Sequence, residues 1–171
     1  GTARIWQAAS GDPIGDPLLH SGRVNLATFS PDGRWVATAS ADQTARVWDA
    51  TSGTPVTDAL RHNGIVRWVE FSPEGQRLAT TSEDRTARVW SVATGEVLLE
   101  PIHHRSTVWT VRFSPEGRRL VTASADGAAQ IWDALPGAVA VVTLPLGSRV
   151  QKASWSPDGG RVLTVARTAR L

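Results

Sequence analysis

Apolar and polar residues alternate in short runs along the chain, and these runs predict β-strands. A representative unit contains expected strands at residues 66–71, 77–82 and 86–90, followed by a looser outer strand at 96–102. The segment SPEG at residues 72–75 joins the first two strands and places proline and glycine where a tight turn favours them. The pattern therefore predicts an all-β unit of four strands.

The same unit recurs with a period of 42 residues. Equivalent positions carry related residue types: one column holds Phe29, Phe71, Phe113 and Trp155, a second holds Trp6, Trp48, Trp90 and Trp132, and Ser-Pro dipeptides begin at residues 30, 72, 114 and 156. A period of about 40 to 45 residues with a Trp-Asp ending is typical of the blades of a β-propeller.

The repeats end in Trp48-Asp49 and Trp132-Asp133, with Trp90-Ser91 as a variant. In these motifs and in its period the chain resembles the WD40 repeat family over essentially all 171 residues. The resemblance implies an all-β, WD40-type β-propeller of four-stranded antiparallel blades. The nearly identical, Ala- and Arg-rich repeats are similar to bacterial WD40 arrays, which are often appended to a kinase or nucleotide-switch domain.

The repeat boundaries divide residues 1–171, which we interpret as a single propeller or half-propeller. The expected parts are the third and outer strands of a split blade at 1–19, full repeats at 20–61, 62–103 and 104–145, and a degenerate partial repeat at 146–171. In the last repeat Leu146 stands where the others have histidine, and residues 167–171 fit the third-strand pattern only if two residues are deleted.

These parts amount to about four blades per chain, and two hypotheses describe how a ring is completed. In the first, two chains form a homodimer with eight blades, because each chain begins with the half-blade that the other lacks at its end. In the second, the missing blades lie on a longer parent chain. A closed ring of four is less favoured, because it would demand a steep angle between neighbouring blades. Since the sequence contains no methionine, we expect a trimmed, excised or processed chain.

Composition narrows the class of protein. The chain is 41% hydrophobic and 20% charged, with no apolar run of membrane-spanning length and no signal-like start, so we expect a soluble, cytoplasmic protein. The pI near 10.3 accompanies a net charge of only +2, because no Tyr or Cys and a single lysine, Lys152, leave little to titrate above neutral pH. A nucleic-acid partner is therefore not expected.

The resemblance implies four polar columns: a loop histidine, a second-strand hydroxyl, a turn aspartate and the third-strand tryptophan. In the three full repeats they are His20, Thr38 or Ser40, Asp42 and Trp48; His62, Thr80 or Ser82, Asp84 and Trp90; and His104, Thr122 or Ser124, Asp126 and Trp132. A buried indole N–H needs an acceptor, which a hydroxyl, an imidazole and a carboxylate can supply in sequence. Three equivalent copies favour a structural network over a hydrolase triad.

Other site chemistry finds little support in the sequence. His103 and His104 are adjacent on an extended segment, so their side chains are expected on opposite faces, and no spacing places three metal ligands together. A glycine-rich strand-to-helix loop for phosphate is also missing. We therefore expect neither a metal nor a cofactor.

The first strand of each repeat predicts a binding surface. Its apolar positions change parity between Val24 and Ala27, which indicates a bulge, and bulges re-aim side chains. In relatives this end of the strand and the following turn face the top rim and central channel. Positions there differ in chemistry from repeat to repeat, and the candidate partner-binding residues are Arg23, Asn25, Arg67, Trp68, Glu83, Trp109, Arg149 and Gln151.

Three tryptophans, Trp35, Trp68 and Trp109, lie outside the structural columns. They are either binding residues or covers for the flank of a neighbouring blade. We expect a non-enzymatic scaffold that binds a protein or peptide through its rim. A carbohydrate- or small-ligand-binding propeller is the alternative, and a hydrolase is third.

Overall fold

The computed structural model describes residues 1–134 and 140–167; residues 135–139 and 168–171, which include most of the expected irregular end of the last repeat, lie outside this range. All regular structure within it is β-strand, and it holds no helix that could cross a membrane. The expectation of an all-β fold is confirmed.

The strands form two two-stranded hairpins and three complete antiparallel blades. The first hairpin is β1 (Thr2–Trp6) and β2 (Pro13–Leu19). The complete blades are β3 (Val24–Phe29), β4 (Trp35–Ser40), β5 (Thr44–Asp49) and β6 (Leu60–Arg61); β7 (Val66–Phe71), β8 (Arg77–Ser82), β9 (Thr86–Ser91) and β10 (Ile102–His103); and β11 (Val108–Phe113), β12 (Arg119–Ser124), β13 (Ala128–Asp133) and β14 (Ala140–Pro145). The last hairpin is β15 (Val150–Trp155) and β16 (Val162–Ala166).

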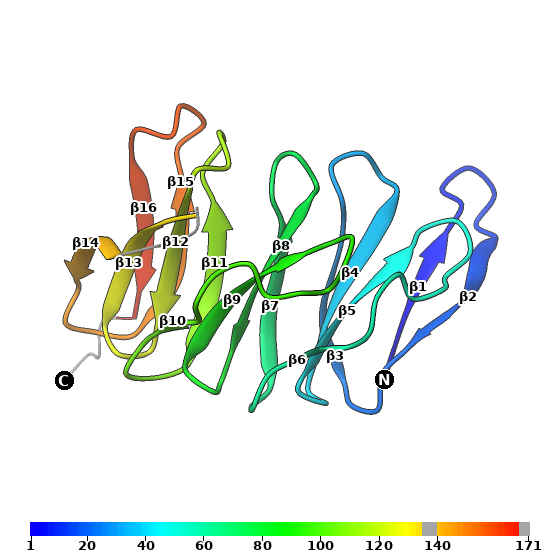
Figure 1. Ribbon diagram of the computed structural model, residues 1–171, viewed down its shortest axis with the longest axis horizontal. Coiled ribbons are helices and arrows are strands. Elements are labelled where there is room, and N and C mark those ends of the chain that lie inside the picture. The colour runs from blue at the N-terminus through cyan, green and yellow to red at the C-terminus, as the bar shows by residue number, and fades with distance from the viewer. Residues whose placement is uncertain (135–139, 168–171) are drawn as a thin grey trace.

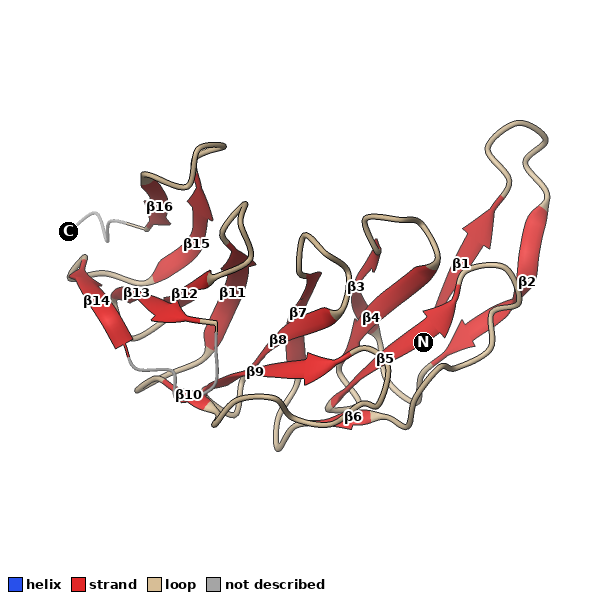
Figure 2. Ribbon diagram, turned by 45° about the horizontal axis from the view of Figure 1, so that its top comes forward, coloured by secondary structure: helices blue, strands red, loops and turns tan. Residues whose placement is uncertain are grey.

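The blades stand side by side in an open arc, with the β1–β2 and β15–β16 hairpins at its two ends (Figures 1 and 2). Neighbouring blades pack through their first strands, so that β7 contacts both β3 and β11, and β11 contacts β15. The outer strands make no comparable contacts. The first strands therefore line the inner side of the arc. The three complete blades and two hairpins do not close into a four-bladed ring.

The hydrophobic core lies between blades. In the interface between the first two complete blades, Val47 of one blade packs in a cluster with Val66 and Phe71 of the next. Each second strand, such as β8, is buried along nearly its whole length, because a neighbouring blade covers each face. A blade is thus a thin sheet with two apolar faces, and its stability depends on both neighbours.

The expected bulge is present in all four first strands. Pairing with the second strand shifts register between Val24 and Leu26, Val66 and Trp68, Val108 and Thr110, and Val150 and Lys152. The bulged residues are those of the predicted variable column, and they lie at one end of the blades, beside the turn between second and third strands.

The outer strand of the second repeat is shorter than predicted. Instead of residues 96–102, only Ile102–His103 pair regularly with β9, and an isolated bridge joins Trp90 to Val97. Between these points the Leu99 side chain is buried in the core, and Pro101 has no N–H to donate. The segment therefore leaves the ladder between the two points.

Candidate functional site

A chain of hydrogen bonds crosses each complete blade. In the first, Trp48 Nε1 donates to Thr38 Oγ1 (2.8 Å), which lies 2.7 Å from His20 Nε2, and His20 Nδ1 lies 2.8 Å from Asp42 Oδ2. The same chain runs through Trp90, Thr80, His62 and Asp84, and through Trp132, Thr122, His104 and Asp126. It ties the loop before the first strand to the second and third strands.

The hydroxyl in each chain comes from threonine, not from the serine two residues later. Ser40 instead donates to the carbonyl of Gly22 (3.2 Å) and accepts the backbone N–H of Asp42 (3.1 Å). Ser82 and Ser124 accept the N–H of the following aspartates in the same way. Because strand side chains alternate, the threonine and the serine two residues away lie on the same face of the strand. The histidine lies level with the threonine along the strand, so it bonds to the threonine and not to the serine.

Burial lowers the pKa of His20, His62 and His104, although the neighbouring aspartate of each opposes the shift. Burial works against ionisation of Asp42, but bonds from Thr44 and His20 outweigh it and hold the pKa of this carboxyl well below its usual range. We therefore assign neutral histidines that donate from Nδ1 to aspartate and accept the threonine O–H at Nε2. Every polar group in this series of hydrogen bonds then has a partner.

This geometry leaves no room for substrate at any of the three copies. The histidine side chains are fully buried, as are Thr38, Thr80 and Thr122. A nucleophile needs access to a carbonyl carbon and an oxyanion hole beside it, and these hydroxyls have no such access. His103 is exposed while His104 is buried, and no group of three potential metal ligands occurs in residues 1–134 or 140–167.

Thr44 and Thr86 also belong to the network, and sequence reasoning missed them. Each hydroxyl donates to the nearby aspartate, Thr44 to Asp42 at 2.6 Å and Thr86 to Asp84 at 2.7 Å. In the third blade Ala128 takes this place, the histidine–aspartate distance is 3.1 Å, and Trp132 is only half-buried. The sequence signal that could have revealed them is a threonine two residues after the turn aspartate, which occurs in two of the three full repeats.

A second group of residues forms a row along the bulged ends of the first strands, which we call the rim. Arg23 Nε donates to Asn25 Oδ1 (3.2 Å), and Asn25 Nδ2 donates to the carbonyl of Val66 in the next blade (2.8 Å). The bulged Asn25 side chain thus reaches the following blade. The rim is continuous across blade boundaries.

Trp109 is the centre of the rim. The guanidinium carbons of Arg67 and Arg149 lie 5.2 and 4.1 Å from the centroid of its ring. Arg67 is paired with Glu83. Arg149 is exposed and has no acidic partner among the described residues, and the buried Nε1 of Trp109 has no acceptor among them. The structure thus brings together four predicted residues, two from the second complete blade, one from the third and one from the last hairpin.

Two predicted rim residues lie elsewhere. Trp68 follows the bulge, so its indole turns toward the next blade and packs against the core there, with the Arg112 guanidinium 4.7 Å from its ring centroid. This placement makes Trp68 an interblade residue, and Trp35 packs likewise on the preceding interface. Gln151 is half-buried at the end of the row, where the arc stops.

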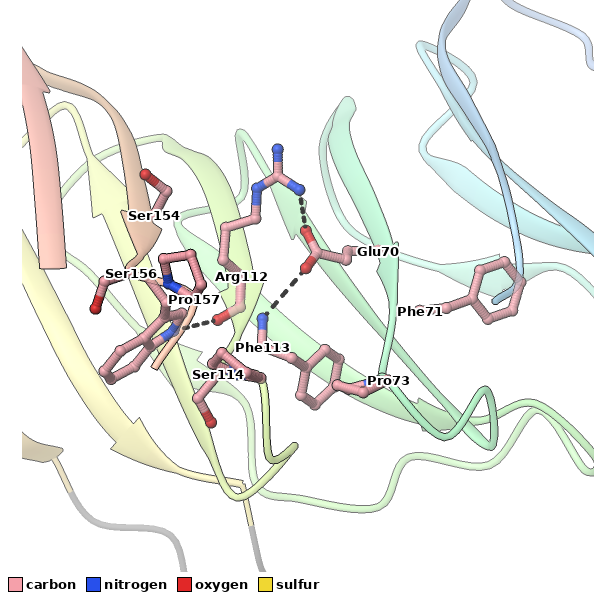
Figure 3. Close-up of a pocket in the computed structure, with 11 residues that line it drawn as sticks. Glu70, Phe71, Pro73, Arg112, Phe113, Ser114, Ser154, Ser156 and Pro157 are labelled. Carbon is pink, nitrogen blue, oxygen red and sulfur yellow. Dashed lines mark hydrogen bonds and ion pairs between the residues drawn. The ribbon is translucent and has the colours of Figure 1, made fainter. Parts of the chain in front are cut away.

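A shallow groove between the first strands contains a third polar cluster (Figure 3). Glu70 accepts a bond from Arg112 Nη1 (2.8 Å), and Trp155 Nε1 donates to the carbonyl of Arg112 (3.1 Å). Burial raises the pKa of Glu70, although Arg112 opposes this. Because the charged groups are already paired across the blade boundary, the cluster joins blades and leaves little for a ligand.

The network makes His62 a residue on which stability depends. His62→Ala removes the imidazole bonds of Thr80 and Asp84, so the free energy of unfolding should fall by about 1 to 3 kcal/mol. Urea denaturation measures the difference. Asn63→Ala, which removes an exposed side chain next to it, is the control, and equal stability of the two variants would contradict a structural role for His62.

The missing hydroxyl in the third blade can be restored. We expect Ala128→Thr to raise the free energy of unfolding by about 0.5 to 1.5 kcal/mol, because the new hydroxyl can donate to Asp126 as Thr86 does to Asp84. The reciprocal change, Thr86→Ala, should lower it by a similar amount. Denaturant midpoints for both variants test this, and a change of the same sign in both would show that the hydroxyl does not act through the aspartate.

The neutral histidines predict a pH dependence. Because their pKa values in the folded chain lie below the ordinary 6.5, the unfolded chain binds more protons, and stability should fall as pH drops below about 6.5. The lowered aspartate pKa values add a further loss below about pH 4. Unfolding measured between pH 7 and 5 should show a shallower slope for His62→Gln than for His103→Gln, which changes an exposed histidine. Identical slopes would mean that folding does not shift the pKa of His62, and a steeper slope for His62→Gln would mean that His62 is protonated in the fold.

Comparisons with known proteins agree with this architecture. The family model for "WD40: WD domain, G-beta repeat" matches residues 15–49, 53–91 and 95–133. Among solved structures, the chain is similar to the computationally designed Ika8 protein, with 25% sequence identity and a TM-score of 0.85, over 97% of this chain and 50% of that one. It therefore spans half the length of that structure. The search of curated proteins found no match. With three matched repeats that cover most of its length, the chain belongs to the WD40 repeat family.

Proposed function

We propose that this WD40 module is a non-enzymatic scaffold that binds a protein or peptide segment at its rim. WD40 repeats commonly serve as binding scaffolds, and one observation points to the rim of this one. The guanidinium of Arg149 lies 4.1 Å from the ring centroid of Trp109, and this exposed arginine lacks an acidic partner among the described residues. A backbone carbonyl or carboxylate of a peptide would supply the acceptor for this guanidinium.

The stacking of Arg149 supports a peptide over a sugar. A carbohydrate packs its C–H face on an open aromatic ring, but the Trp109 ring already has two guanidinium groups within 5.2 Å of its centroid. A guanidinium held over an indole keeps its N–H edge free for a carboxylate or carbonyl oxygen. The buried threonine hydroxyls give a hydrolase no comparable support.

The charge of the rim is local. Glu83 neutralises Arg67, and the chain as a whole carries a formal net charge of only +2, so nothing resembles the long cationic track of a nucleic-acid binder. We propose a cytoplasmic protein partner. A complete ring also needs strands beyond those of this chain, either from a longer parent chain or from a second copy.

An array of short peptides printed beside an array of glycans tests the proposal. The labelled protein should bind a subset of peptides, and a Trp109→Ala, Arg149→Ala double variant should bind them about tenfold or more weakly, because it loses the central contacts. The matched control is Arg46→Ala, which removes an arginine from a third strand away from the rim.

Binding to glycans but not to peptides would favour the carbohydrate alternative. Loss of peptide binding in Arg46→Ala, with the double variant unaffected, would place the binding surface on another face. A circular dichroism spectrum unchanged in both variants shows that any loss is not caused by unfolding.

A further inference from the structure

The two ends of the arc expose apolar residues that complete blades bury. Trp6 is 58% exposed, whereas Trp48 and Trp90, in the same column, are 4% and 5% exposed. Leu163 is 68% exposed, whereas its counterpart Ala37 is completely buried. The difference arises because, among the described residues, no second strand pairs with β1 and no third strand pairs with β16.

The β1 end also carries a groove that matches a missing strand. Ile5, Trp6, Phe29 and Val36 line it. In the next blade Phe71, the counterpart of Phe29, is buried because it packs on Ala37 and Val47 from the second and third strands of the preceding blade. Phe29 has the third strand before it, but not the second, and is 55% exposed. A second strand seated in this groove would cover Phe29 and Trp6 together.

We infer that a second copy of this chain fills the groove with its β15–β16 hairpin, so that two copies build two identical composite blades. This inference concerns assembly and does not depend on the proposed rim function. One edge of β1 pairs with β2 and one edge of β16 with β15, and no other strand in the described part of the chain pairs with either. Unpaired edges favour the addition of a strand.

The repeat defines the register of the composite blade. In the first complete blade Val36, Ala37 and Thr38 pair with Trp48, Val47 and Arg46. Carried over by the 42-residue period, this register pairs Val162 with Trp6 and Thr164 with Arg4. The Thr164 hydroxyl then lies where Thr38 accepts the indole N–H of Trp48, so it can accept that of Trp6.

The rim continues across the same junction. Asn25 donates its side-chain amide to the carbonyl of Val66 in the following blade. Gln151 occupies the equivalent bulge of the last hairpin, and the blade that follows it in the composite ring begins with Val24 of the second copy. Its amide can therefore make the corresponding bond, which gives this half-buried side chain a partner.

The curvature of the arc fits a ring larger than this chain, which a second copy would complete. The chain superposes on the designed structure with a TM-score of 0.85 over 97% of its own length, yet it covers 50% of that chain. Its blades are therefore arranged as in a fold of twice this length. Two copies related by a twofold axis supply that length and leave neither a half-blade nor an open edge.

Light scattering after size-exclusion chromatography gives the first test. The chain should elute at twice the 18.3 kDa mass of one copy. Leu163→Asp, which places a charge in the composite core, should shift it to the monomer mass with its circular dichroism retained. Val141→Asp, on the outer strand β14 and also at an exposed position, is the matched control and should remain a dimer. A wild-type monomer, or an open series of larger species, would overturn the inference.

Disulfide trapping tests the register, because the chain has no cysteine of its own. An Arg4→Cys, Thr164→Cys variant should form a covalent dimer under mild oxidation, whereas Arg4→Cys, Val162→Cys, offset by two residues, should form much less. A disulfide within one chain would instead show that the two hairpins meet in the same molecule. Equal cross-linking in both variants would show that the strands do not pair in this register.

Discussion

The need to cover both faces of each blade governs this structure. A four-stranded blade is one sheet thick, so its second strand can be buried only when a neighbour packs on each side. Residues such as Ala37, Leu78 and Val121 achieve this within the arc. At one end of the arc Leu163, in the column of Ala37 and Val121, is exposed, and at the other end Trp6 and Phe29 are exposed.

Within a blade, the polar network has a different task. Strand pairing alone does not fix the loop that precedes the first strand, and the histidine in that loop is held by bonds to the second strand and the following turn. Because the chain of donors and acceptors is complete only with neutral histidine, burial and hydrogen bonding reinforce each other. The third blade, where Ala128 replaces threonine, shows the same network with one bond fewer.

The rim depends on both of these features. The bulge turns one residue of each first strand out of the alternating pattern, and interblade packing brings residues from successive blades within contact distance. Trp109, Arg67 and Arg149 meet only because three blades stand at the observed angle. The proposed binding surface therefore lies at the blade boundaries, on a scaffold whose polar network is already satisfied.

The periodic sequence by itself determined the all-β character, the repeat length and the position of the bulge, because each follows from spacing within one repeat, and the resemblance to the WD40 family added the four polar columns. Only the tertiary structure decided whether Thr38 or Ser40 bonds to His20. Both lie on the same face of the strand, and it is Thr38 that lies level with the imidazole. The tertiary structure also assigned Trp68 to an interblade core and Trp109 to the rim, although they are adjacent columns of one bulge. Contacts between blades depend on the angle between sheets, and no periodicity along a single chain encodes that angle directly.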